Sequence, residues 1–171
     1  MRIISNDANI LIDLVHLNMM NNFIQLELDL KTTDFIFEEL NDDQKEIINV
    51  YIESNQIELI TTEEDEDFES IASILDNSSG LSFEDCSVWH YANKLNGILL
   101  SGDGKLRKQA TANGVSVKGI LYIFDQLLLK KLISFDYAME KIEELYKINP
   151  RLPIDAKDER ISNWSDEKNV S

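Results

Sequence analysis

Short apolar runs rich in β-branched residues alternate along the chain with longer segments whose apolar side chains recur at helical spacing. The short runs predict strands at Arg2–Ser5, Phe35–Phe37, Ile57–Thr61, Ile98–Ser101 and Val115–Val117. Such an alternation is typical of a parallel sheet that helices cover on both faces. We therefore expect an α/β protein with three layers, α/β/α, around a central parallel sheet of four to five strands.

The longer segments are expected to be helices, with an apolar stripe on one face and polar residues on the other. Two of them are followed by a glycine, Gly97 and Gly114, at the point where helices commonly end. One segment is apolar on nearly all sides, so it must be deeply buried or shared with another subunit. That segment is the fourth of the expected helices, which are Glu38–Ser54, Phe83–Asn96, Gly104–Asn113, Ile120–Leu132 and Phe135–Ile148.

The last helix is followed by the stretch Pro150–Pro153, where we expect compact structure to end. Beyond it the apolar anchors are few, namely Ile154, Ile161 and Trp164. We therefore expect one domain over residues 1–150 and an appended arm over residues 151–171. A length of 171 residues is enough for one domain with a real core.

The composition is that of an ordinary globular protein, with 43% hydrophobic and 28% charged residues. No apolar run approaches the roughly 18 residues that a membrane-spanning helix needs. The first apolar stretch is broken by Ser5, Asn6 and Asp7, so no secretory signal is visible. The single Cys86 has no partner for a disulfide, which suits a reducing compartment. We expect a cytoplasmic protein that does not enter the membrane.

The formal net charge is −16, from 32 acidic and 16 basic side chains. A protein that only gripped a nucleic-acid backbone would normally be basic, so the charge counts against a simple nucleic-acid binder. A nuclease stays compatible with it, because carboxylates that bind divalent cations add negative charge. Much of the acidic excess lies in Glu63–Glu69 and in the tail from Asp155 onward, and both are expected to be solvated surface.

Acidic residues recur at corresponding places near the predicted strands. Asp7 follows the first strand, Glu38 and Glu39 follow the second, Asp85 comes early in the helix before the fourth, and Asp103 follows the fourth. The carboxyl ends of parallel strands lie on one edge of a sheet, where ligands bind. Carboxylates that converge there repel each other unless a cation neutralises them.

A plainer interpretation exists for each of these acids, because acidic residues are the expected choice at helix N-termini. Asp7 and Asp103 can cap the helices that follow them, and Ser82 with Asp85 has the spacing of a capping box. Glu38 and Glu39 can complement a helix dipole. Capping explains each acid taken singly, and it leaves open why all of them occur together.

Four segments resemble the motifs of the PIN-domain family, and the resemblance extends over nearly the whole chain. They are Ser5–Ile12 (SNDANILI), Phe35–Leu40 (FIFEEL), Leu81–Ser87 (LSFEDCS) and Leu99–Arg107 (LLSGDGKLR). The resemblance implies a PIN-like, Rossmann-like fold. It also implies a site made of Asp7, Glu39, Asp85 and Asp103, with Glu38 as the reserve for Glu39.

The activity implied by the resemblance is hydrolysis of RNA phosphodiester bonds with Mg²⁺ or Mn²⁺, which these acids would hold. Asn9 and Ser101 would support the site by orienting a ligand or water, or else hold a turn. Gly104 stands where many relatives carry a further acid, so the sequence leaves open whether the site holds one ion or two. The RNA backbone could be received by Lys105, Arg107 and Lys108, which also fit an ordinary basic helix face.

Many PIN proteins of this size resemble the toxin halves of toxin–antitoxin pairs. The resemblance therefore implies a small antitoxin protein as partner, and a homodimer to which Ile120–Leu132 could supply the contact. A phosphatase of the haloacid dehalogenase type is disfavoured, because those enzymes carry an acid where this chain has Asn9. The alternative from another class is a catalytically silent PIN-like module that binds protein, which the large negative charge favours.

Overall fold

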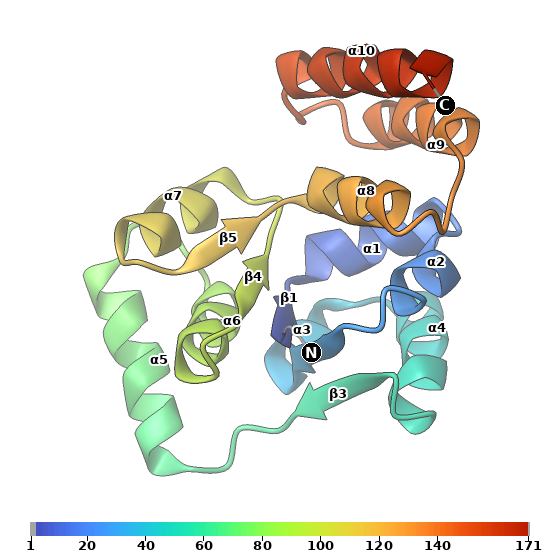
Figure 1. Ribbon diagram of the computed structural model, residues 1–171. Coiled ribbons are helices and arrows are strands. Elements are labelled where there is room, and N and C mark those ends of the chain that lie inside the picture. The colour runs from blue at the N-terminus through green and yellow to red at the C-terminus, as the bar shows by residue number, and fades with distance from the viewer. Residues whose placement is uncertain (1–2, 171) are drawn as a thin grey trace.

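A parallel sheet of five strands forms the centre of the molecule, as Figure 1 shows for the computed structural model of residues 3–170. The strands are β1 (Ile3–Asn6), β2 (Asp29–Thr33), β3 (Ile57–Ile60), β4 (Ile98–Leu100) and β5 (Ser116–Lys118). Their order across the sheet is β3-β2-β1-β4-β5. Arg2 of the first expected strand and Ser171 of the expected arm lie outside the described residues.

Helices cover both faces of this sheet, so the expected three-layer α/β/α fold is confirmed. In the described residues they are α1 (Ala8–His16), α2 (Met20–Ile24), α3 (Asp34–Glu39), α4 (Asp42–Glu53), α5 (Asp65–Asn77), α6 (Phe83–Lys94), α7 (Gly104–Ala112), α8 (Ile120–Leu129), α9 (Phe135–Ile148) and α10 (Ile154–Val170). Helices α5, α6 and α7 lie on one side of the sheet, and α1, α2, α4 and α8 on the other (Figure 1). None of the helices between residues 3 and 170 is long and apolar enough to cross a membrane.

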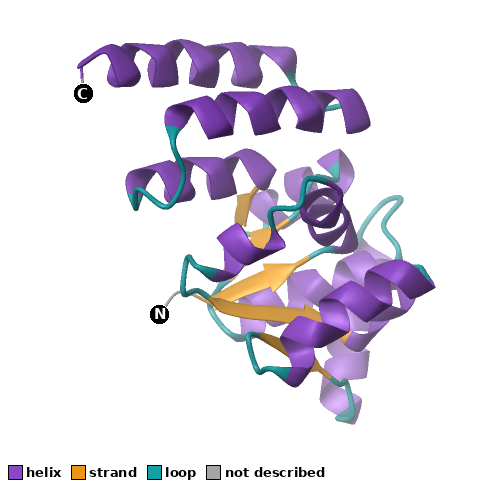
Figure 2. Cartoon of the chain, turned by 90° about the vertical axis from the view of Figure 1, so that its right-hand side faces the viewer, coloured by secondary structure: helices purple, strands orange, loops and turns teal. Residues whose placement is uncertain are grey.

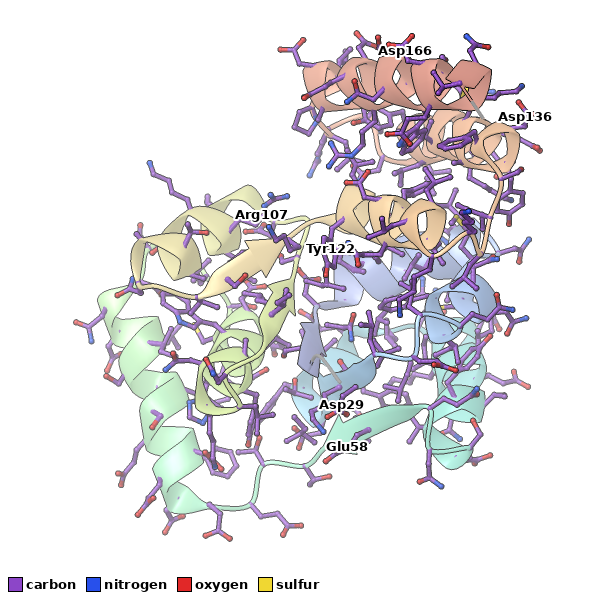
Figure 3. All side chains as sticks on the ribbon, in the orientation of Figure 1. Asp29, Glu58, Arg107, Tyr122, Asp136 and Asp166 are labelled. Carbon is purple, nitrogen blue, oxygen red and sulfur yellow. The ribbon has the colours of Figure 1, made fainter. Side chains whose placement is uncertain are left out.

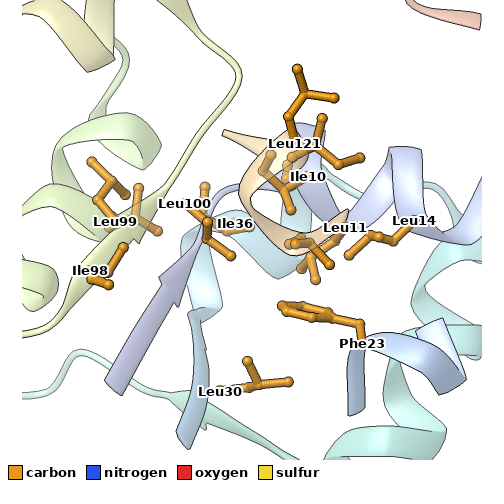
Figure 4. Close-up of a cluster of buried hydrophobic side chains, with 14 of the residues drawn as sticks. Ile10, Leu11, Leu14, Phe23, Leu30, Ile36, Ile98, Leu99, Leu100 and Leu121 are labelled. Carbon is orange, nitrogen blue, oxygen red and sulfur yellow. The ribbon is translucent and has the colours of Figure 1, made fainter. Parts of the chain in front are cut away.

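The core forms where the central strands meet these helices. All three side chains of β4 are buried, as is expected for a strand that is covered on both faces. On the α1 side, Leu11 and Leu14 lie near Phe23 of α2, as the close-up in Figure 4 shows. These apolar layers fix the strand ends from which the candidate site is built.

The second strand was predicted in the wrong place, and the helix expected over Glu38–Ser54 is divided between the end of α3 and α4. Phe35–Phe37 is helical within α3, and the strand before it is Asp29–Thr33. Thr33 caps that helix by accepting a hydrogen bond from Ile36 N at 3.2 Å. The charges of β2 hid it from the sequence pattern. Lys31 is nevertheless only 8% exposed, because its ammonium pairs with Asp29 and with Glu58 on β3.

Figure 3 labels both of these acids and shows them on neighbouring strands. A lysine can be buried when its charge is paired in this way. The propensity of Phe35–Phe37 for strand was therefore overridden by a tertiary ion pair and by a cap. Both effects link residues that a local pattern of apolar positions does not connect.

Helices α9 and α10 stack on α8, on its side away from the sheet, as Figure 2 shows. Helix α8 is buried mainly within its own chain, and its large exposed apolar side chain is Leu129, at 75% exposure. Trp164 of α10 is 4% exposed and stacks on Phe124 of α8, with 6.1 Å between the ring centroids. The division into a domain of 1–150 and an arm of 151–171 stays a prediction.

Candidate metal centre

Asp7 lies directly after β1, at the carboxyl edge of the sheet, and is 2% exposed. Its backbone N–H donates to Leu100 O of the neighbouring strand at 3.0 Å. Its carboxylate accepts a hydrogen bond from Asn9 N at 2.6 Å, which caps α1, and a short one from the Ser101 hydroxyl. The side chain is therefore fixed from both β1 and β4.

Asp103 follows β4 and caps α7, with Oδ1 accepting from Leu106 N at 2.8 Å. Its own N–H donates to the Ser101 hydroxyl oxygen at 3.1 Å. Because the same hydroxyl donates to Asp7, Ser101 joins the two acids through one buried group. Strands β1 and β4 are neighbours at the point where the strand order reverses, which is where open α/β sheets bind ligands.

Asp85 reaches this edge from α6, which packs against β1, β2 and β4. It forms a capping box with Ser82, in which two hydrogen bonds of 3.0 Å run in opposite directions. Further along the helix, Val88 O accepts a hydrogen bond from the Ser5 hydroxyl of β1 at 3.0 Å. The start of α6 is thus held against the strand that leads to Asp7.

The structure separates the two neighbouring glutamates, Glu38 and Glu39. The carboxylate of Glu38 accepts a hydrogen bond from Lys45 Nζ of α4 at 2.9 Å. Glu39 is the last residue of α3, and its carboxylate is close enough to Asp7 and Asp85 for their charges to act on it. Of the two, Glu39 is therefore the one beside Asp7 and Asp85, and its role as a ligand stays a prediction.

Electrostatics connects the four candidate acids. Burial raises the pKa of Asp7 to about 6; hydrogen bonds from Ser101 and Asn9 oppose the rise, and the charges of Asp85 and Asp103 add to it. Partial burial and the charges of Glu84, Asp85 and Asp7 raise the pKa of Glu39 to about 7. Burial is the larger cause of each raised pKa, and repulsion between ionised groups adds to it; a bound cation would relieve that repulsion.

The donor set suits a hard divalent cation, because all four candidates offer carboxylate oxygens. As the side chains stand, no three acidic, histidine or cysteine groups among residues 3–170 are close enough together to ligate one ion. Mg²⁺ is usually held by one or two protein carboxylates, with waters and substrate oxygens completing its shell. The acids present fit that mode of binding.

Capping and ion binding are compatible here. Asp7, Asp85 and Asp103 all make the capping hydrogen bonds that the plainer interpretation expects. Within the described part of the chain, however, Asp85 Oδ1 and Asp103 Oδ2 accept no hydrogen bond. Capping therefore orients these two carboxylates and leaves an oxygen of each for another ligand.

The residues expected to support the site and those expected to bind RNA differ in how they lie relative to the four acids. Asn9 is exposed and meets Asp7 through its backbone N–H, whereas Ser101 is buried between two acids. Lys105, Arg107 and Lys108 are all exposed on α7. The Lys105 side chain lies over Gly80, and the Arg107 guanidinium lies against Gly119 at the start of α8. Figure 3 shows Arg107 near that junction.

One acid near the site was not singled out from the sequence. Glu84 is the largest electrostatic contributor, after partial burial, to the raised pKa of Glu39. It lies beside Asp85 in the chain and at the start of α6. Its position next to a candidate ligand was a signal, but the sequence did not reveal that α3 brings Glu39 close to it.

Solved structures of low sequence identity resemble this chain. PAE2754 from Pyrobaculum aerophilum aligns with a TM-score of 0.53 and 14% identity, covering 74% of this chain and 96% of that one. VapBC-1 from nontypeable Haemophilus influenzae aligns with a TM-score of 0.50 and 14% identity, covering 70% and 98%. FitAcB from Neisseria gonorrhoeae aligns with a TM-score of 0.43 and 15% identity, covering 67% and 95%. The first two likenesses concern the fold.

No curated protein matches this sequence. A family model described as the PIN domain matches residues 2–166, which is nearly the whole chain. The match includes all four segments whose motifs resemble that family and every strand of the sheet. The chain therefore belongs to the PIN-domain family.

Proposed function

We propose that this protein is a metal-dependent endoribonuclease that hydrolyses RNA phosphodiester bonds. Asp7, Glu39, Asp85 and Asp103 would hold Mg²⁺ or Mn²⁺ at the carboxyl edge of the sheet. The observation that carries the proposal is that these acids act on each other's ionisation. The charges of Asp85 and Asp103 contribute to the raised pKa of Asp7, and those of Asp85 and Asp7 contribute to the raised pKa of Glu39. Acids from four separate segments thus share one electrostatic environment.

When bound, a divalent cation supplies a nucleophile from water near neutral pH and offsets negative charge on the phosphate. The chain's own groups have the task of orienting the carboxylates. The Ser101 hydroxyl fixes Asp7 relative to Asp103, and Ser82 fixes Asp85. Burial keeps water away from Asp7, so its charge acts more strongly than an exposed one would.

RNA would reach the site past α7, where the exposed Lys105, Arg107 and Lys108 reduce the local negative charge. Because phosphates are repelled by acids, the α7 side is the favourable path. We assign the three basic residues to contacts with the RNA backbone, which bring affinity without sequence preference.

We also propose that the protein acts as the toxin of a toxin–antitoxin pair, with a small antitoxin protein as partner. This rests on the resemblance of its motifs to those of bacterial PIN proteins. Homodimer formation belongs to the same proposal. Cross-linking or light scattering of the purified chain tests the dimer, and a strict monomer at high concentration would refute it.

The activity is tested by incubating the purified chain with assorted RNAs and Mn²⁺ or Mg²⁺, beside the variant Asp103→Asn. Asp166→Asn serves as the matched control, because Asp166 is an exposed acid on α10, which packs on α9 and not on the candidate acids. We expect cleavage by the wild type and the control, its loss in Asp103→Asn, and its loss with a chelator. Cleavage that survives Asp103→Asn would refute the carboxylate site.

A further inference from the structure

The loop between α5 and α6 is held against α7 by hydrogen bonds with the side chain of Gln109. Ser79 N donates to Gln109 Oε1 at 2.9 Å, and Gln109 Nε2 donates back to Ser79 O at 3.0 Å. The amide thus satisfies both backbone groups of one loop residue, as a neighbouring strand would. This pair of bonds links positions that are 30 residues apart in the chain.

A second side chain of α7 meets the same loop one helical turn earlier. Gly80 has a φ of +70°, and a Cβ at that position would lie 3.0 Å from Lys105 Nζ. Residues 105 and 109 are neighbours on one helix face because they are four residues apart. Gln109 Nε2 also lies 3.3 Å from Lys105 O. One face of α7 therefore covers the loop from Ser79 to Gly80.

Two of the candidate metal ligands lie at the ends of this connection. The loop leads into Ser82, which forms the capping box that orients Asp85. At the other end, α7 begins at Asp103, whose carboxylate caps it. A displacement of the loop relative to α7 would therefore displace Asp85 relative to Asp103.

We infer that Gln109 is a positioning residue, whose reciprocal hydrogen bonds to Ser79 set the separation of Asp85 from Asp103. Gln109 acts through the loop and touches none of the four candidate acids. Its consequence for ion binding rests on the proposed function; its hold on the loop does not. Sites that bind ions tolerate displacements of only about 0.5 Å, so a link of this kind is consequential.

The chain contains its own reporter for this loop. Cys86 is the only cysteine, it is fully buried on α6, and Ser78 of the loop lies close enough to its thiol to act on it. Because the thiol is buried, a thiol reagent reaches it slowly while the loop is closed. Release of the loop should therefore speed labelling of Cys86.

The experiment compares the wild type with Gln109→Met, which keeps the length of the side chain and removes both hydrogen bonds to Ser79 together with the one to Lys105 O. Gln109→Ala is the second variant, and Thr111→Ala, an exposed change on the same helix, is the control. Two quantities are measured on the metal-free full chain: the rate at which an aromatic disulfide reagent labels Cys86, and the Kd for Mn²⁺ alone. Circular dichroism establishes that each variant is folded.

We expect Gln109→Met to label about tenfold faster, which corresponds to the loss of one or two ordinary hydrogen bonds. We expect its Kd for Mn²⁺ to rise by about tenfold or more, as when groups behind a metal ligand are removed. Thr111→Ala should match the wild type in both. Unchanged labelling would overturn the inference, and so would faster labelling with an unchanged Kd. A wild type that binds no Mn²⁺ would refute the proposed function itself.

Discussion

Replacing Asp7 with asparagine should make the metal-free protein more stable at pH 8, although it removes a proposed ligand. The folded protein raises the pKa of Asp7 from 3.8 to about 6. A carboxyl group with a raised pKa favours folding when it is protonated, below pH 3.8, and this advantage is lost as the pH rises through 6. Above that pH the wild type carries a buried charge that the asparagine variant lacks.

The size of the effect follows from the shift. A difference of about 2 pKa units corresponds to about 3 kcal/mol between the two ionisation states. The 2% exposure of Asp7 means that solvent screens little of this cost. Asparagine can still accept from Asn9 N but not also from Ser101, which removes about 1 kcal/mol. The net gain at pH 8 is about 2 kcal/mol.

The assay is urea unfolding of the wild type and of Asp7→Asn at pH 8 and at pH 5, with a chelator present. The difference in the free energy of unfolding should be about 2 kcal/mol at pH 8 and should shrink to below about 1 kcal/mol at pH 5, because Asp7 is protonated in the folded chain there. Adding Mg²⁺ at pH 8 should stabilise the wild type alone. A variant that is less stable than the wild type at pH 8, by as much as at pH 5, would refute the reasoning.

Further predictions concern the acids and the C-terminal helices. Affinity for Mn²⁺ should fall as the pH drops from 8 to 6, because Glu39 and Asp7, with pKa values of about 7 and 6, must both lose their protons to bind it. An affinity that calorimetric titration finds to be the same at every pH in this range would contradict this. Glu39→Gln should slow RNA cleavage by more than about 100-fold, since even groups behind metal ligands contribute about 10- to 100-fold. The cleavage rate of Glu38→Gln should stay within about twofold of the wild type, because Glu38 pairs with Lys45. A gel assay in which the two variants lose cleavage equally would contradict this. Trp164→Ala should lower the free energy of unfolding by about 3 kcal/mol, because the ring is buried on Phe124. A loss below about 1 kcal/mol in urea unfolding would mean that the arm contributes little to the domain.

The residues of the candidate site could be proposed from the sequence because each lies beside a recognisable local signal. Asp7 and Asp103 follow apolar runs that are strands, and Asp85 follows a serine at capping-box spacing. Glu39 was proposed with a wrongly placed strand before it. The proposal of Glu39 did not depend on that strand, because its motif included the residue itself, whereas the place of the strand depended on a pairing of charges.

What the sequence determined by itself was the alternation of strands and helices, because the spacing of apolar side chains is a local property. Where β2 lies was decided by the tertiary structure, since burying Lys31 requires Glu58 from another strand. The same holds for the turn of Glu39 away from Glu38, for the Ser101 hydroxyl shared by two acids, and for the hold of Gln109 on Ser79. Each of these depends on groups far apart in the chain, which interact only once the sheet has brought them together.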